Sequence, residues 1–203
     1  MTMLILAAAT LVSLEIGLAQ ERASAQQLFE AGRYREALQA IAEQREAGTA
    51  GATEGYLAVQ ILLKLDEQDN AKSELSRFAD HAEPVWRAIG ESARAQIVKD
   101  ENGALQAAER AVAMAPNHFF AHYQLGLVLA DRADWAGAAA RFDRAADIDP
   151  MFAYAHYYAG FSYSKVKRVD RMAVHFERFL KLAPKAPERP AVESIMRTLR
   201  GRQ

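Results

Sequence analysis

The sequence contains no cysteine among its 203 residues, and this absence removes several classes of chemistry at once. Disulfides, zinc sites with thiolate ligands, cysteine nucleophiles and a lipid anchor on an N-terminal cysteine are all excluded. The absence does not identify a cellular compartment.

The sequence also has little overall charge, with a formal net charge of −1. The whole molecule is therefore not expected to prefer nucleic acid or an acidic substrate. The charge is unevenly placed, because residues 165–203 hold 11 Lys and Arg against 4 Asp and Glu, a net of +7, and residues 1–164 carry −8. The basic end either steers an acidic partner or a membrane surface toward it or forms a solvated cap, and both alternatives stay open.

No group of residues marks a catalytic, nucleotide or metal site. The glycine-rich loop at 48–55 lacks the Gly-Lys-Ser/Thr ending and the preceding strand of a phosphate-binding loop. His118 and His122 are four residues apart, but no carboxylate at a suitable spacing completes a metal motif. No Ser, His and Asp arrangement stands out either, so we expect no enzyme activity, no cofactor and no metal.

What the sequence does contain is a repeat between residues 119 and 184. Each residue of 119–150 pairs with the residue 34 positions later, without insertion, and most pairs keep their size class. The clearest pairs are His122 with His156, Gly126 with Gly160, Phe142 with Phe176, and Pro150 with Pro184. A fixed period of this length predicts one supersecondary unit stacked on its copy.

Each unit has the pattern of two antiparallel helices. In the first copy, residues at i, i+3, i+4 and i+7 share one helix face: His122, Leu125, Gly126 and Leu129. Asp134 is a suitable N-cap for a second helix, whose inner face carries Ala138, Phe142 and Ala145 before Pro150 ends it. Glycine within a helix costs about 1 kcal/mol relative to alanine, so Gly126 predicts close approach of the paired helix near Ala138.

These residues closely resemble the tetratricopeptide repeat, which has a Leu-Gly pair in its first helix and an Ala, aromatic, Ala and Pro series in its second. The matching residues are Leu125, Gly126, Ala138, Phe142, Ala145 and Pro150; in the second copy, Ala159 and Phe179 depart from the pattern. The resemblance implies an all-α fold, a right-handed α-solenoid of antiparallel helix pairs with a C-terminal capping helix. It also implies a non-catalytic protein-interaction scaffold.

Weaker copies extend the repeat through most of residues 20–203. The expected units are 20–47, 52–81, 84–116, 119–150 and 153–184, followed by a capping helix at 190–200. In the third unit, Gly90 is aligned with Gly126, which places two extra residues near the turn at 100–103. The amphipathic helix after Pro184 is what an open solenoid needs to cover its last apolar face.

A second stripe of large residues lies beside the packing face of the repeats. It consists of Phe120, Tyr123, Leu127, Tyr154, Tyr157 and Phe161. In tetratricopeptide arrays this face lines the concave groove, so these residues are the predicted partner-binding site. The alternative is that they pack on neighbouring helices. Because Tyr123 and Leu127 stand where chaperone-tail binders have Lys and Asn, the resemblance does not imply that ligand.

The expected partner is a protein, as an extended peptide or a helix laid in the groove, and not a nucleic acid. Two alternatives stay open: a membrane-tethered assembly factor that self-associates through the solenoid ends, and an accessory domain for an envelope enzyme.

Residues 1–19 resemble a secretory signal, because residues 4–18 are mostly apolar and small residues precede Gln20. Glu15 and the lack of a basic residue before Arg22 depart from that pattern, so a retained anchor and a first solenoid helix are alternatives. We expect an exported protein of the periplasm or cell envelope, with membrane proximity if the anchor is kept.

Cleavage after Ala19 gives the first testable outcome. The native protein should begin at or near Gln20, which N-terminal sequencing of material from the native host would establish. An intact Met1 would reject cleavage and favour the anchor.

Overall fold

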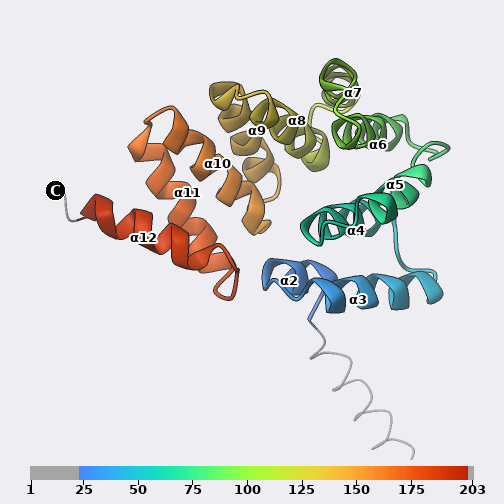
Figure 1. Cartoon of the computed structure of the whole chain (residues 1–203), viewed down its shortest axis with the longest axis horizontal. Coiled ribbons are helices and arrows are strands. Elements are labelled where there is room, and N and C mark those ends of the chain that lie inside the picture. Colours follow the sequence, from blue (N-terminus) through green and yellow to red (C-terminus); the bar gives the residue numbers. More distant parts are fainter. Residues whose placement is uncertain (1–22, 201–203) are drawn as a thin grey trace, which may run out of the picture.

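The structure, a computed structural model, describes residues 23–200, and the expected signal segment at 1–19 lies outside them. The described chain consists of consecutive helices joined by short turns (Figure 1). They are α2 (Ala25–Glu30), α3 (Tyr34–Glu46), α4 (Ala52–Lys64), α5 (Gln68–Ser76), α6 (Pro84–Ile97), α7 (Glu101–Met114), α8 (Phe119–Asp131), α9 (Trp135–Ile148), α10 (Ala153–Lys165), α11 (Val169–Leu182) and α12 (Arg189–Arg200). Even-numbered helices up to α10 are the first, or A, helices of five pairs, and the following helices are their B helices.

The turn inside each helix pair is set by one residue with a left-handed backbone. These residues are Gly32, Asp66, Lys99, Ala133 and Lys167, each with φ between +59° and +73°. Their spacing is 34, 33, 34 and 34 residues, so the repeat continues through the whole described chain. Asp100 and Asp134 each follow such a residue, and their side chains accept backbone N–H bonds from Gly103 and Gly137 at the start of the B helix.

The third repeat corrects the expected alignment of Gly90, and no extra residues lie in its turn. α7 begins at Glu101 and α9 at Trp135, 34 residues later, so the residue equivalent to Gly126 is Ser92. Ser92 is fully buried, and its hydroxyl donates to the Ala104 carbonyl at 2.8 Å. Gly90 has another role, because a Cβ there would lie 2.5 Å from Phe78 Cβ of the preceding repeat.

Small residues let the paired helices approach closely in the last two repeats. A Cβ on Gly126 would lie 2.7 to 2.9 Å from ring atoms of Phe142, and one on Gly160 would lie 2.6 Å from Phe176. Both phenylalanine rings are buried. The predicted close approach at Gly126 is present, but the nearest atoms belong to Phe142 and not to Ala138. The consecutive helix pairs confirm the all-α solenoid.

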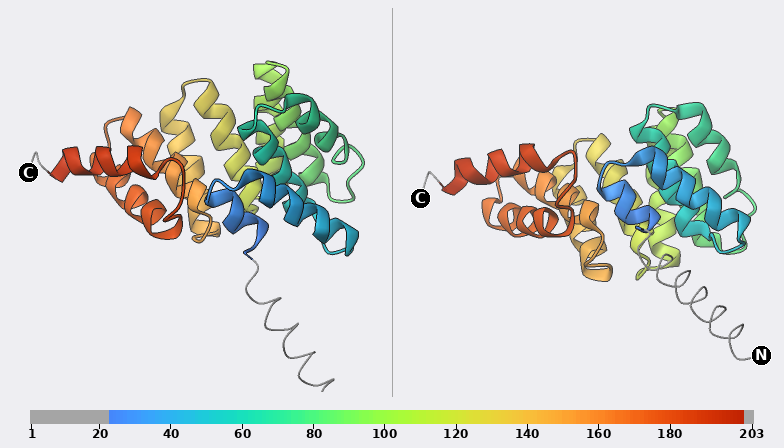
Figure 2. Two further views of the ribbon diagram at one scale, coloured as in Figure 1. Left: turned by 60° about the horizontal axis from the view of Figure 1, so that its bottom comes forward. Right: turned by 90° about the horizontal axis from the view of Figure 1, so that it is seen from below.

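The five repeats curve until the first meets the last (Figures 1 and 2). α2 lies beside the start of α10 and the loop between α11 and α12. Three kinds of contact join segments that are far apart in the sequence. The Ala153 N–H donates to Glu30 Oε1 at 2.9 Å, Lys64 Nζ lies 2.9 Å from Glu188 Oε1, and Gly32 lies against Pro187. We call this junction the seam.

α12 packs on α11 and covers the last repeat, with Val192 and Met196 buried. This position agrees with the predicted capping role. Within residues 23–200, no helix has both the length and the apolar character needed to cross a membrane.

Replacing Gly126 with leucine should lower the free energy of unfolding by about 1 to 3 kcal/mol, because the side chain would overlap the Phe142 ring. Denaturant unfolding measures the change. Phe142→Ala alone should cost about 3 to 5 kcal/mol. The double variant should cost clearly less than the sum, since the alanine frees the space that the introduced leucine side chain needs. Additive costs would show that the two side chains are not in contact.

Candidate interaction surface

The structure gathers the six predicted site residues on two neighbouring A helices. Phe120, Tyr123 and Leu127 lie on α8, and Tyr154, Tyr157 and Phe161 lie on α10. Rings on α10 contact one another: the Tyr154 and Tyr157 centroids are 5.9 Å apart and the Tyr157 and Phe161 centroids 6.4 Å apart. The stripe therefore exists as a continuous feature of α10.

Half of this set is covered by the protein itself. Phe120 is 8% exposed, Tyr123 1% and Tyr154 0%, so the expectation that these rings face solvent is wrong. Tyr123 is covered by rings of its own and the next repeat, among them Phe142 and Phe152. For Phe120 and Tyr154, the curvature of the solenoid brings the first two repeats over the concave side. Phe29 lies 4.8 Å from Tyr154 between ring centroids, and Tyr56 lies 5.1 Å from Phe120.

Tyr157 and Phe161 are only half-buried, and two residues that the sequence did not indicate join them. The Trp135 ring lies edge-on to Phe161 at 5.8 Å, and Lys165 Nζ lies 4.9 Å from the Phe161 centroid and 5.6 Å from that of Trp135. The signal in the sequence was the i, i+4 spacing of Phe161 and Lys165. We call Tyr157, Phe161, Trp135 and Lys165 the aromatic strip.

Leu127 belongs to a different place, a cleft of about 230 Å³ between α4, α6 and α8. Its apolar side chains are Leu63, Ala93, Ile97 and Leu127; its polar ones are Gln60, Gln68, Gln96, Lys99 and Asp131. The Gln96 amide donates to Asp131 Oδ2 at 2.7 Å, which joins α6 to α8 across the cleft. The structure thus separates Leu127 from the aromatic strip.

A chain of buried hydrogen bonds supports the floor of the concave side. The Tyr56 hydroxyl donates to Gln124 Oε1, and Gln124 Nε2 donates to Ser92 Oγ at 3.0 Å. Tyr56 and Gln124 are fully buried, and burial raises the pKa of the Tyr56 hydroxyl. Because buried polar groups are costly without partners, this chain fixes the relative positions of three A helices.

The two histidines of the repeat pattern have a structural role. His122 Nε2 donates to the Pro116 carbonyl at 2.9 Å, and His156 Nε2 to the Pro150 carbonyl at 3.2 Å. Each histidine thus binds the proline that closes the preceding repeat. Within the described residues, no three His, Asp or Glu side chains are placed to hold a metal ion.

The fifth repeat adds a second histidine to this arrangement. His156 Nδ1 lies 3.1 Å from His175 Nδ1, and His175 Nε2 lies 2.9 Å from Asp143 Oδ1. Both Nε2 atoms face oxygen acceptors, so the contact between the two Nδ1 atoms depends on which ring nitrogens carry protons. At the equivalent position of the fourth repeat stands Arg141, and His122 Nδ1 is buried without a partner.

Burial and neighbouring groups shift the pKa values of His156 and Asp143. Burial lowers the pKa of His156, the Pro150 carbonyl opposes this shift, and the charges of His175 and Arg178 lower the pKa further. Burial would raise the pKa of Asp143, but hydrogen bonds from His175 and Tyr163 lower it to about 2. All members of the group have partners within the fold, so the group stabilises the fifth repeat.

No protein-family model matches the sequence, and no curated protein matches it. Among solved structures, the chain is similar to TTC0263, a tetratricopeptide-repeat protein of Thermus thermophilus. The identity is 19% over 84% of this chain and 94% of that chain, with a TM-score of 0.60. It is also similar to the tetratricopeptide-repeat domain of Arabidopsis OM64, at 16% identity over 57% of this chain and 95% of that one, with a TM-score of 0.53. The chain therefore has the tetratricopeptide-repeat fold.

The lowered pKa of His156 predicts a loss of stability below neutral pH. A histidine whose pKa is lower in the folded than in the unfolded state binds fewer protons when folded, so the free energy of unfolding rises with pH. The contribution of His156 should be complete above about pH 6.5 and be lost as the pH falls through its folded pKa. Denaturant unfolding at pH 7 and pH 5 should show a smaller loss for His156→Gln than for the wild type. Equal losses would contradict a lowered pKa of His156 in the folded protein.

Proposed function

We propose that the chain is a non-catalytic protein-interaction scaffold that binds an extended peptide or a helix at the aromatic strip. The observation that carries this proposal is the group of half-buried rings formed by Tyr157, Phe161 and Trp135 beside Lys165. The core is complete without full burial of these side chains, because Phe142, Phe176 and Phe179 already fill the interior between the last helix pairs. Exposed rings on a rigid surface are typical of partner sites.

The chemistry of the strip suggests the character of the bound segment. Aromatic rings offer a large contact area at low cost in conformational entropy. Lys165 is exposed, and within residues 23–200 it makes no ion pair, only the two ring contacts. An apolar side chain against Phe161 and a carboxylate near Lys165 would therefore complement the strip.

Export to the periplasm or cell envelope is part of the proposal. It is supported by the apolar stretch at 4–18 in the sequence and by the start of the repeats. Ser24 forms a capping box with Gln27, so α2 begins downstream of the expected cleavage site at Gln20. Removal of residues 1–19 would leave α2 to α12 intact, because all of them lie after the cleavage site.

Affinity capture with the full chain tests the proposed site. Phe161→Ala and Trp135→Ala should each weaken binding of the captured partner by about 2 kcal/mol, roughly 30-fold, because they remove rings from the contact surface. Captured proteins from the native envelope fraction are identified by mass spectrometry, and the affinity for the purified partner is then measured.

Val174→Ala is the matched control. Val174 lies on α11 and is 58% exposed, so its truncation removes an exposed apolar side chain away from the strip. It should leave the affinity unchanged, and all three variants should unfold within about 1 kcal/mol of the wild type. A partner that binds Phe161→Ala and Trp135→Ala as tightly as the wild type would rule out the strip as its site.

A further inference from the structure

α2 covers residues of α10, in the fifth repeat, that would face the concave groove of an open array. Phe29 and Glu30 end α2, and they correspond in the repeat to Leu63 and Lys64, which lie 34 residues later and end α4. In the folded chain, these two residues lie against the first turn of α10 rather than against their own neighbours alone. The first repeat therefore contributes the side chains that cover the first turn of α10 on its concave side.

The Phe29 ring enters an aromatic pocket. Its centroid is 4.8 Å from that of Tyr154 and 6.0 Å from that of Tyr34, and Phe29 is only 2% exposed. Tyr154 is one of the residues that the sequence predicted for partner binding. An aromatic side chain of the protein itself thus satisfies the expected binding surface.

The Glu30 carboxylate provides a second, directional contact. Its Oε1 accepts the N–H of Ala153, the first residue of α10, at 2.9 Å, and a bond from Gln26 at 3.1 Å. A negative charge at a helix N-terminus is favourable because the N–H groups there point toward it. Burial raises the pKa of Glu30, and the Ala153 bond acts against this shift. The site therefore recognises a ring and an adjacent carboxylate.

The element that makes these contacts is short. α2 has six residues, whereas the other A helices have 13 or 14. A helix of this length is not stable alone, so α2 depends on its docking contacts.

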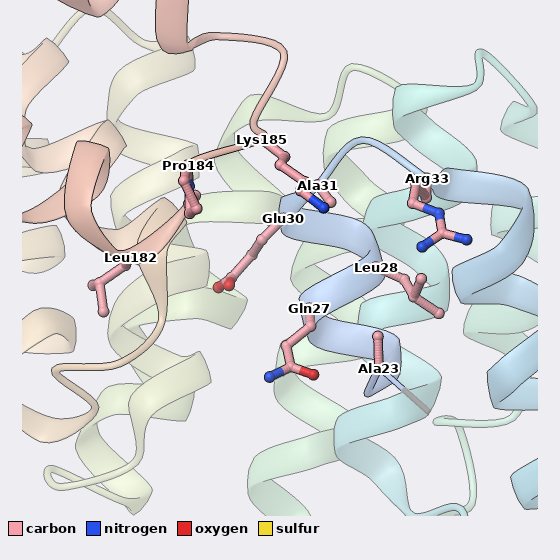
Figure 3. A pocket seen from close by; sticks show the side chains of 10 residues that line it. Ala23, Gln27, Leu28, Glu30, Ala31, Arg33, Leu182, Pro184 and Lys185 are labelled. Carbon is pink, nitrogen blue, oxygen red and sulfur yellow. The ribbon is translucent and has the colours of Figure 1, made fainter. Parts of the chain in front are cut away.

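The seam beside α2 is also incompletely packed. A cleft of about 270 Å³ is lined by Gln27 and Glu30 of α2, by Leu182 at the end of α11, and by Lys185 in the following loop (Figure 3). α2 packs on α3 with Ala25 and Leu28 buried, and on its other side it meets α10 next to open space.

We propose that α2 occupies a partner site on the concave side, and that the partner is a short helix with an aromatic residue followed by a carboxylate, which replaces α2 on Tyr154 and Ala153. This proposal extends the proposed function, because it adds a site next to the aromatic strip. Opening the seam uncovers the α10 face, and closing it restores the intramolecular contact.

A disulfide across the seam tests whether the opening occurs. A Cβ built on Gly32 lies 4.0 Å from the Pro187 Cβ, within the range of disulfides, and the chain has no other cysteine. In the full-length Gly32→Cys/Pro187→Cys variant, oxidation should slow hydrogen exchange of the Ala153 amide at least tenfold. Exchange within α8 should change much less. Equal exchange of Ala153 in the oxidised and reduced protein would overturn the proposal.

A labelled synthetic peptide with the sequence of residues 23–33 tests the identity of the partner. Fluorescence anisotropy should show binding to the reduced double variant and at least tenfold weaker binding to the oxidised one. Peptides carrying Phe29→Ala or Glu30→Gln should bind at least tenfold more weakly than the unaltered peptide. Absence of binding to the reduced protein, or equal binding of the altered peptides, would overturn the proposal.

Glu188→Gln in the otherwise unchanged full chain gives a second route, free of the strain that cysteine meets at the positive φ of Gly32. It weakens the contacts of Glu188 with Lys64 and Tyr154, at 2.9 and 2.8 Å, without altering α2. Peptide binding should increase several-fold over the wild type, and no increase would count against the seam. These measurements need no native partner, so their failure would leave the effect of Phe161→Ala on capture as a separate result.

Discussion

The contact between a small residue on the A helices α6, α8 and α10 and the facing B helix determines how these repeats stack. Gly126 and Gly160 let the rings of Phe142 and Phe176 reach the helix backbone, and Ser92 binds the Ala104 carbonyl at the same position. Because these repeats use nearly the same contact, the small rotation between neighbours accumulates in one direction. Over five repeats it brings α2 to α10, so the overall shape follows from packing inside single repeats.

Curvature also decides which aromatic residues are available to a partner. In an open array, the concave side would present the large residues of both α8 and α10. Here the first two repeats cover part of those helices. Phe120 and Tyr154 become core residues in this way, whereas Tyr157 and Phe161 stay partly exposed. The same side of the molecule therefore combines a buried layer that stabilises the fold with a smaller accessible surface.

Local features were predictable from the sequence, and features that depend on distant repeats were not. The 34-residue period, the Asp134 cap and the close approach at Gly126 all depend on neighbours within one unit. Which of Gly90 and Ser92 corresponds to Gly126 depended on packing, because both residues are small and lie only two positions apart. The burial of Tyr154 could not be deduced, since it depends on Phe29, 125 residues earlier in the chain, and thus on the summed rotation of four repeat junctions.

The seam gives this solenoid a folding problem that open arrays do not have. Most of its contacts join adjacent repeats, but the bond between Glu30 and Ala153 closes a loop of 123 residues. For a flexible chain, the length-dependent entropy of such a closure is about 4 kcal/mol at 25 °C. The intervening repeats must therefore be stacked before the ends can meet at low cost. Docking of the first repeat is expected to be a late step of folding and the first step of unfolding.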